Sequence, residues 1–276
     1  MNRPLLVLSL AAVCGISLPT AARQGQLRTV YISVLDSSGM PVPDLRLADL
    51  VVTEDDQTRQ VSNVERATVP ARLALIVEEH ELWSGSVRAS IKALVTRVPQ
   101  GWQVGLFSAE RPELTIVDFT NEPTRVLHAI EVFTPITLKH DNANVHFEAL
   151  VQDLATQFHR QEVARPIILA MTPQRNSSPN WDLIIRDVLR SRTSVFAACT
   201  SEMGLLVSKG VEVSGGRAEI VLTEVSMPTA VSRILDDMVG QFAVTYISPT
   251  APRDGFRLRV RVNRPNTDVR APERVY

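Results

Sequence analysis

Residues 72–82 read Arg-Leu-Ala-Leu-Ile-Val-Glu-Glu-His-Glu-Leu. The apolar run from Leu73 to Val77 is too short for a buried helix and has the length of a central strand covered on both faces. Polar residues, Glu78 to Glu81, follow where this strand is expected to end. In open α/β sheets ligands bind at the carboxyl ends of the strands. The stretch therefore predicts the fold class and the place of a site.

The chain downstream alternates between short apolar runs and segments with helical spacing. Strands are predicted at 102–107, 114–119, 166–171 and 194–199, the first two joined by a hairpin. Helices are predicted at 86–98, 124–133, 146–159, 181–190 and 229–239, where apolar residues recur at three- and four-residue intervals. Strands separated by helices of this length predict a doubly wound, mostly parallel α/β sheet.

Both ends of the mature chain are β-rich. Strands are expected at 27–36, 50–53 and 58–66, and again at 241–248, 256–262 and 266–276. Each end alone is too small to bury a core of its own. We therefore divide the chain into a signal peptide (1–22), an N-terminal β segment (23–70), an α/β domain (71–247) and a C-terminal β segment (248–276). The two β segments are predicted to pair into one small β-sandwich, with the α/β domain inserted between them.

One C-terminal strand carries a row of arginines. Residues 256–262 alternate strictly, and Arg257, Arg259 and Arg261 occupy the face opposite the apolar residues. Such a row either binds an anionic surface or is a solvated face whose charges pair with acids on a neighbouring strand. The chain as a whole, with a formal net charge of −1, offers no general electrostatic attraction for nucleic acid or for an anionic membrane.

The N-terminus has the pattern of an export signal. Arg3 precedes an apolar stretch at 5–18, and Thr20-Ala21-Ala22 provides small residues for cleavage. The stretch is shorter than the roughly 20 residues of a membrane-spanning helix, although an uncleaved anchor is the alternative. We expect a periplasmic or secreted bacterial protein with no membrane span after cleavage. Cys199 is then the single remaining cysteine, so no internal disulfide forms, and its apolar strand predicts a buried thiol.

Several motifs near the two ends resemble one family. They are 34–45 (Val-Leu-Asp-Ser-Ser-Gly-Met-Pro-Val-Pro-Asp-Leu), 49–55 (Asp-Leu-Val-Val-Thr-Glu-Asp), 241–246 (Gln-Phe-Ala-Val-Thr-Tyr), and the C-terminal 257–265, 269–271 and 275–276. In this order the chain resembles von Willebrand factor A (vWA) domains, and more narrowly the secreted VWFA-related proteins of Acidobacteria. The resemblance spans nearly the whole mature chain and implies a Rossmann-like sheet and a protein-binding or adhesive role.

The resemblance also implies a metal site, and this chain departs from it. Family members hold a divalent cation through an Asp-x-Ser-x-Ser loop, a Thr and a later Asp, whose oxygens suit a hard cation. The matching positions here are Glu78, His80, Leu82, Asn144 and Pro173. Leu82 and Pro173 have no side-chain oxygen, and His80 offers nitrogen in place of a hydroxyl. We therefore expect a degenerate metal site, with no metal and no cofactor.

The polar residues expected at the carboxyl ends of the strands, which we call the rim, support three hypotheses of function. The leading one is a non-enzymatic, metal-independent module that binds an unidentified protein partner through 78–83, 140–144 and 174–178. Further partner contacts are expected at Glu79, Glu81, Trp83, His140 and Asp141. The second is a metal-dependent adhesive domain with altered ligands, since histidine and carboxylate suit Zn²⁺. The third is a hydrolase that uses the Glu/His rim, although the sequence contains no Gly-x-Ser-x-Gly, phosphate-binding loop or dinucleotide fingerprint.

Overall fold

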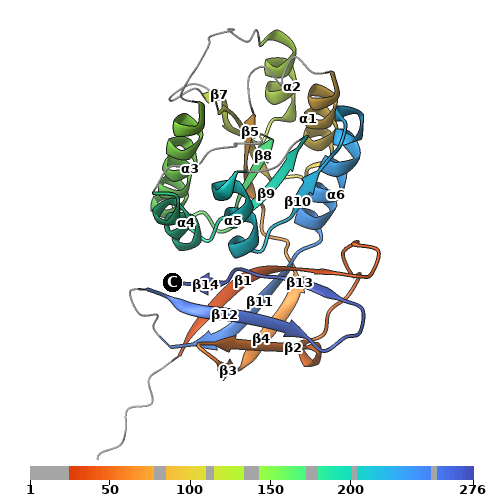
Figure 1. Ribbon diagram of the computed structural model, residues 1–276. Coiled ribbons are helices and arrows are strands. Elements are labelled where there is room, and N and C mark those ends of the chain that lie inside the picture. Colours follow the sequence, from red (N-terminus) through yellow and green to blue (C-terminus); the bar gives the residue numbers. More distant parts are fainter. Residues whose placement is uncertain are drawn as a thin grey trace, which may run out of the picture.

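The computed structural model describes residues 25–77, 85–109, 115–133, 143–171, 180–200, 204–249 and 254–276, with backbone only at 143–145. They form a large α/β unit above a small β unit (Figure 1). The rim residues predicted as a site follow strands of the large unit, so that unit is described first.

The large unit contains one six-stranded sheet. Its strands are β5 (Arg72–Val77), β6 (Gln103–Ser108), β7 (Thr115–Thr120), β8 (Pro166–Met171), β9 (Ser194–Cys199) and β10 (Ala218–Ile220). They lie in the order β10-β9-β8-β5-β6-β7, and only β7 is antiparallel to its neighbour. Counted within this sheet the order is 6-5-4-1-2-3, which is the doubly wound arrangement. The predicted fold class is confirmed.

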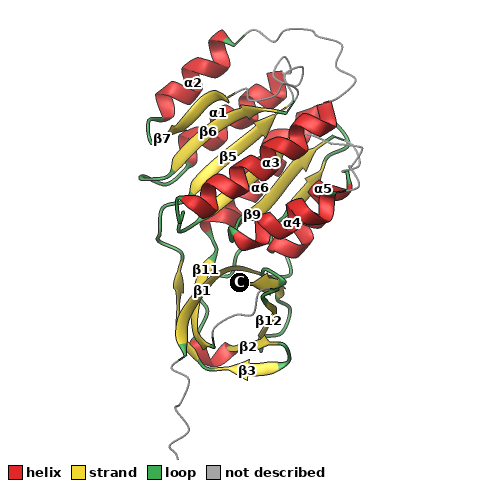
Figure 2. Cartoon of the chain, turned by 90° about the vertical axis from the view of Figure 1, so that its left-hand side faces the viewer, coloured by secondary structure: helices red, strands yellow, loops and turns green. Residues whose placement is uncertain are grey.

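Helices cover both faces of this sheet (Figure 2). One face packs against α1 (Gly85–Arg97), α2 (Pro123–Val132) and α6 (Met227–Val239). The other face packs against α3 (Ala143–Arg160), α4 (Trp181–Arg190) and α5 (Leu205–Ser214). A short 3-10 helix, η3 (Glu224–Ser226), precedes α6.

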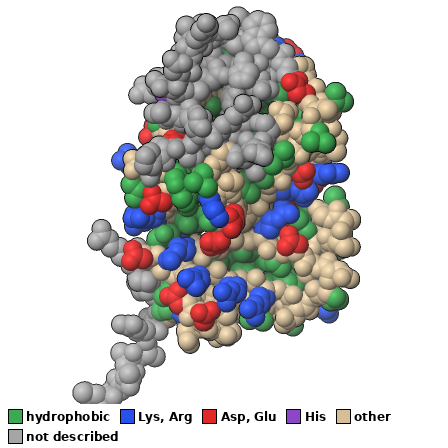
Figure 3. All heavy atoms as spheres, in the orientation of Figure 1, with side chains coloured by type: hydrophobic (Ala, Val, Ile, Leu, Met, Phe, Trp, Pro, Cys, Tyr) green, Lys and Arg blue, Asp and Glu red, His purple; other side chains and the backbone are tan. Residues whose placement is uncertain are grey.

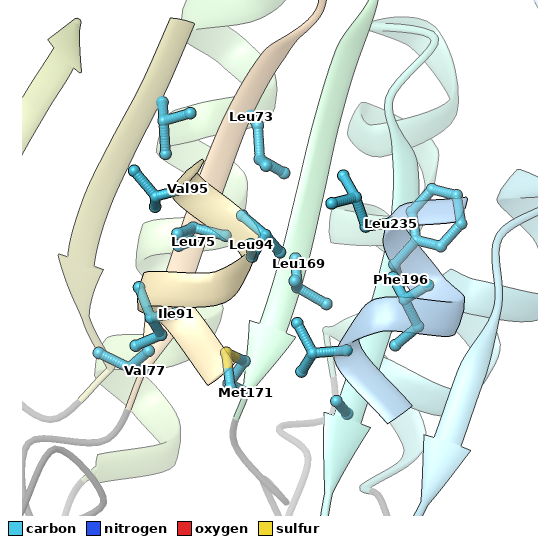
Figure 4. Close-up of a cluster of buried hydrophobic side chains, with 14 of the residues drawn as sticks. Leu73, Leu75, Val77, Ile91, Leu94, Val95, Leu169, Met171, Phe196 and Leu235 are labelled. Atoms are coloured by element: carbon cyan, nitrogen blue, oxygen red, sulfur yellow. The ribbon is translucent and has the colours of Figure 1, made fainter. Parts of the chain in front are cut away.

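Burial on both faces explains the continuous apolar run of β5. Leu73, Leu75 and Val77 point to the α1 side, where they meet Ile91 and other side chains of the first core (Figure 4). Ala74 and Ile76 point the opposite way, into the second core. A strand with one solvated face shows alternation instead, which β5 does not.

The small unit consists of two four-stranded antiparallel sheets. One has the order β13-β1-β11-β4 and the other β14-β12-β2-β3. The strands are β1 (Gln26–Leu35), β2 (Leu50–Glu54), β3 (Gln57–Arg59), β4 (Val61–Arg66), β11 (Phe242–Ser248), β12 (Phe256–Val262), β13 (Asp268–Arg270) and β14 (Arg274–Val275), with a 3-10 turn, η1 (Leu47–Asp49), before β2. Inward side chains of both sheets form a single core, which includes Ile32, Val52, Val244 and Leu258.

N- and C-terminal strands pair directly in this unit. β2 pairs with β12, and β1 pairs with both β11 and β13. The large unit is inserted between β4 and β11, and the chain therefore crosses between the units twice, at 67–71 and at 240–241. The small β-sandwich of N- and C-terminal strands is thus confirmed.

Two details of the sequence-based division require correction. We placed residues 71–247 in the α/β domain, but β11 belongs to the small unit, where it pairs with β1 and β4. The alternation of Phe242, Val244 and Tyr246 fills the sandwich core rather than a two-sided sheet. The predicted single strand at 58–66 is two strands, β3 and β4, which belong to different sheets.

No helix within the described ranges is both long enough and apolar enough to cross a membrane. The N-terminal segment at 1–22, predicted to be a signal peptide, lies outside the described residues.

Candidate functional site

The doubly wound order creates a switch point between β5 and β8. From these two neighbouring strands the chain leaves in opposite directions across the sheet, toward β6 from β5 and toward β9 from β8. Their ends are in register, because Val77 pairs with Met171. The last described residues of the two strands therefore lie side by side at one edge of the sheet. This edge, the carboxyl edge, is where open α/β sheets bind ligands.

Most of the predicted rim residues fall outside the part of the chain that the structure describes. Glu78, Glu79, His80, Glu81, Leu82, Trp83, His140, Asp141 and Pro173 lie outside the described residues. Asn144 falls in the first turn of α3, where only the backbone is described. The strand register places Val77 beside Met171, which are the last described residues before two of the three predicted segments, and the geometry of the rim itself stays a prediction.

Buried polar groups do lie at the described part of the carboxyl edge. β6 ends at Ser108, which is almost fully buried, and β9 ends at Cys199, whose predicted burial is confirmed. Glu148 is buried on α3, near the start of that helix. Within the described ranges, no three His, Cys, Asp or Glu side chains are grouped closely enough to hold a metal ion.

An exposed apolar loop borders the same edge. β10 runs parallel to β9, so the residues that follow it emerge at the carboxyl edge. Three large aliphatic side chains there face solvent: Ile220 is 53% exposed, Leu222 97% and Val225 82%. We call these three residues the β10 loop patch. Aliphatic side chains exposed together are typical of protein-contact surfaces.

Sequence reasoning missed this patch. The stretch 218–225 reads Ala-Glu-Ile-Val-Leu-Thr-Glu-Val, and its apolar content predicts burial rather than exposure. Val221 points into the first core beside α6, and Ala218 packs partly buried against the second core. A run of apolar residues does not reveal that the chain turns at a sheet edge, so no sequence signal was available.

The arginine row of β12 lies on the solvent face of the small unit. Figure 3 shows basic side chains, with acidic ones among them, over this part of the surface. Arg257, Arg259 and Arg261 are all exposed, and Arg259 pairs with Asp56 at 3.1 Å. That ion pair, from the turn beside the neighbouring strand β2, supports the solvated-face alternative for the middle arginine.

Inside the small unit, the Glu54 carboxylate is fully buried and well partnered. Arg59 donates to it over 2.8 Å, Arg28 lies 3.8 Å away, and the hydroxyls of Tyr246 and Ser248 donate over 2.9 and 2.8 Å. Burial and the adjacent negative charge raise the pKa of Tyr246 far above its ordinary value. The Glu54 carboxylate thus receives hydrogen bonds on both of its oxygens and sits in the core of the small unit, which is the arrangement of a structural network.

Arg165 makes hydrogen bonds at both places where the chain crosses between the units. Its guanidinium donates to the carbonyls of Ala67 and Val69 in one crossing, over 3.1 and 3.3 Å. It also donates to the carbonyl of Met238 and, over 3.0 Å, to the amide oxygen of Gln241, at the other crossing. Burial lowers the pKa of Arg165 to about 10. The side chain is 2% exposed and has no carboxylate at ion-pair distance among the described residues.

A second tie between the units is an ion pair. Arg270 of β13 donates to Asp237 of α6 over 2.9 Å, and Asp237 is fully buried. Burial raises the pKa of Asp237, while the positive charge of Arg270 opposes that rise. Together with Arg165, this pair fixes how the small unit sits beneath the α/β unit.

Comparisons with known proteins give a fold likeness only. No protein-family model matches this chain, and no curated protein matches its sequence. Among solved structures, a von Willebrand factor type A protein from Catenulispora acidiphila aligns with a TM-score of 0.48 at 6% identity, covering 91% of this chain and 73% of that one. An aerotolerance-related membrane protein from Bacteroides fragilis aligns at 0.46 and 14% identity, covering 61% of this chain and 98% of that one.

BatB from Bacteroides thetaiotaomicron gives a similar result, with a TM-score of 0.45 at 16% identity, covering 62% of this chain and 98% of that one. These likenesses concern the course of the backbone. The fold class is established by the strand order and by the helices on both sheet faces.

Proposed function

We propose that this chain is an exported, non-enzymatic protein-interaction module of the vWA type, and that it binds its partner at the carboxyl edge of the large sheet. The observation that carries the proposal is the β10 loop patch, where aliphatic side chains are held in solvent at the edge where open α/β sheets bind ligands. Leu222 is 97% exposed, so covering its apolar side chain with a partner is favourable.

The acidic rim complements this patch. The segment that follows β5 contains Glu78, Glu79 and Glu81, and Trp83 comes two residues later. Interfaces commonly combine apolar and aromatic anchors with a polar surround. Binding is metal-independent in this proposal because Leu82 and Pro173 occupy positions where the family pattern places oxygen ligands.

The proposal is tested by capture from the host with tagged, mature protein. The wild type is compared with Leu222→Asp, and with Leu27→Asp as the matched control. Leu27 is also a large exposed residue, 70% exposed, but it lies on β1 in the small unit. We expect a protein that is captured in the presence of EDTA by the wild type and by the control, and lost with Leu222→Asp.

Capture that requires a divalent cation supports the alternative, a metal-dependent adhesive domain. Capture that Leu27→Asp abolishes and Leu222→Asp leaves intact places the partner on the small unit and overturns the proposal. Mass analysis of the secreted or periplasmic chain tests the export step, for which we expect a mature N-terminus at Arg23.

A further inference from the structure

A groove opens at the waist of the molecule, where the two units meet, with a volume of about 1380 Å³ that includes solvent at its mouth. Residues that precede β5, β6 and β8 line it, so it lies at the amino ends of the parallel strands, opposite the carboxyl edge. We call it the waist groove. Its charged and amide-bearing lining residues are Arg66, Arg97, Gln100, Arg165 and Asp236. Three arginines thus face one carboxylate.

Arg66 contributes a positive charge that the described part of the chain does not neutralise. Its guanidinium donates to the backbone carbonyls of Val42 and Gly240 and lies 4.3 Å from the ring centre of Phe242. These partners carry no net charge. The acid that acts on it electrostatically is Asp44, and that carboxylate is itself paired with Arg264 at 3.2 Å.

Arg165 adds a second charge of the same kind. Its hydrogen-bond acceptors are carbonyl and amide oxygens, and the rings of Tyr31 and Trp102 lie 5.3 and 5.1 Å from its central carbon. Its Nε is buried and has no hydrogen-bond partner among the described residues. A charge removed from water without an opposite charge nearby is unfavourable, and a bound counter-ion relieves it.

Arg97, unlike Arg66 and Arg165, forms an ion pair with an acid among the described residues of the groove. It donates to Asp236 over 2.6 Å and to Ser232 over 2.6 Å. The opposite charges of Arg97 and Asp236 cancel each other. The electrostatic potential of the groove is therefore set by Arg66 and Arg165. The side chain of Arg97 is 48% exposed, which leaves it able to turn toward a ligand.

We propose that the waist groove binds a small anion that carries at least two carboxylate or phosphate groups. Guanidinium groups recognise both kinds of anion by paired, charge-assisted hydrogen bonds. Clefts between domains are frequent small-molecule sites. Because Arg66 comes from the small unit and Arg97 from the large one, the anion also holds the two units together. This site is independent of the protein-binding role proposed for the carboxyl edge.

Calorimetric titration of the full mature chain with citrate and with pyrophosphate, at fixed ionic strength, tests the site. The variants are Arg97→Gln, Asp236→Asn and the control Arg259→Gln. Arg259 matches Arg97 closely, since its side chain is 49% exposed and pairs with an aspartate, but it lies on β12, away from the groove.

We expect saturable one-to-one binding of at least one of the two anions. Arg97→Gln should weaken it about tenfold, through loss of a charge-assisted contact. Asp236→Asn should strengthen binding because it removes the acid that lines the groove, and Arg259→Gln should leave it unchanged. If citrate binds and pyrophosphate does not, the site recognises carboxylates. The reverse result shows that it recognises phosphates.

Three results overturn the proposal. The first is that neither anion binds saturably at millimolar concentration. The second is that Arg259→Gln weakens binding as much as Arg97→Gln, which indicates general charge attraction. The third is that Asp236→Asn leaves the affinity unchanged. Circular dichroism of each variant confirms that it is folded before titration.

Discussion

Replacement of Arg165 by methionine removes the tie between the two chain crossings while it keeps an unbranched side chain of similar length. The wild-type guanidinium makes hydrogen bonds to four oxygens, two in each crossing region. Each bond from a charged donor contributes about 1.5 kcal/mol or more, so their loss amounts to about 6 kcal/mol. The lowered pKa of Arg165, about 10 against 12.5, indicates that burial of the charge costs about 3 kcal/mol, which the variant regains. The net destabilisation should therefore be about 3 kcal/mol.

Urea unfolding followed by circular dichroism measures this difference. The control is Arg160→Met, at an exposed arginine at the end of α3, which should change the free energy of unfolding by less than about 0.5 kcal/mol. The fluorescence of Trp102, whose ring faces the Arg165 guanidinium, reports whether the waist itself has changed. A loss below about 1 kcal/mol in Arg165→Met would refute the reasoning, because the buried carbonyls would then have other partners.

Further predictions concern buried groups in and between the two units. The raised pKa of Asp237 means that the native state holds its proton more tightly than the unfolded chain. Stability from this group should therefore fall as the pH rises from the ordinary carboxyl range through the raised pKa, and Asp237→Asn should flatten that fall in urea titrations across pH. Tyr246→Phe removes the hydroxyl that donates to Glu54 and should lower the free energy of unfolding by about 2 kcal/mol, whereas an unchanged midpoint would mean that Glu54 needs no such donor. Gly215→Ala should cost about 2 kcal/mol or more in a thermal melt, since Gly215 has φ 76° and a Cβ there would lie 2.5 Å from the backbone of Ala271.

The sequence was most informative where a single physical pattern dominates an element. The run at 166–171 is apolar throughout because both sheet faces are covered, and it was predicted with its correct bounds. The helix at 181–190 was also predicted correctly, since its buried residues recur at three- and four-residue intervals. The alternation at 256–262 gave the inward and outward faces of β12 directly.

Elements fixed by tertiary packing were harder to predict. The helix α5 was missed because Val207, Val211 and Val213, with Gly210 among them, have poor helix propensity. It forms because Leu206, Val207 and Val211 are buried in the second core, a tertiary contact that no local pattern reveals. The helix ends at Gly215, whose backbone adopts the left-handed conformation.

The two candidate sites differ in the same way. The carboxyl edge follows from topology, and the sequence placed polar residues after β5 without showing what stands beside them. The waist groove could not be predicted, because Arg66, Arg97 and Arg165 are far apart in the chain and meet only when the small unit is assembled from both ends. The number of charged residues in a sequence does not show which arginines are left without an acidic partner when the chain folds.

Thermal unfolding of the mature protein tests the central claim, a metal-independent interaction module, most directly. The melting temperature is measured in EDTA and then with Mg²⁺, Mn²⁺, Ca²⁺ and Zn²⁺ in turn. A site filled at 100 times its dissociation constant adds about 2.7 kcal/mol, which corresponds to a rise of about 5–10 °C for a chain of this size. We predict no shift with any of the four ions. A shift of that size, abolished by Glu78→Gln together with His80→Ala, would contradict the account and establish a metal site at the carboxyl edge.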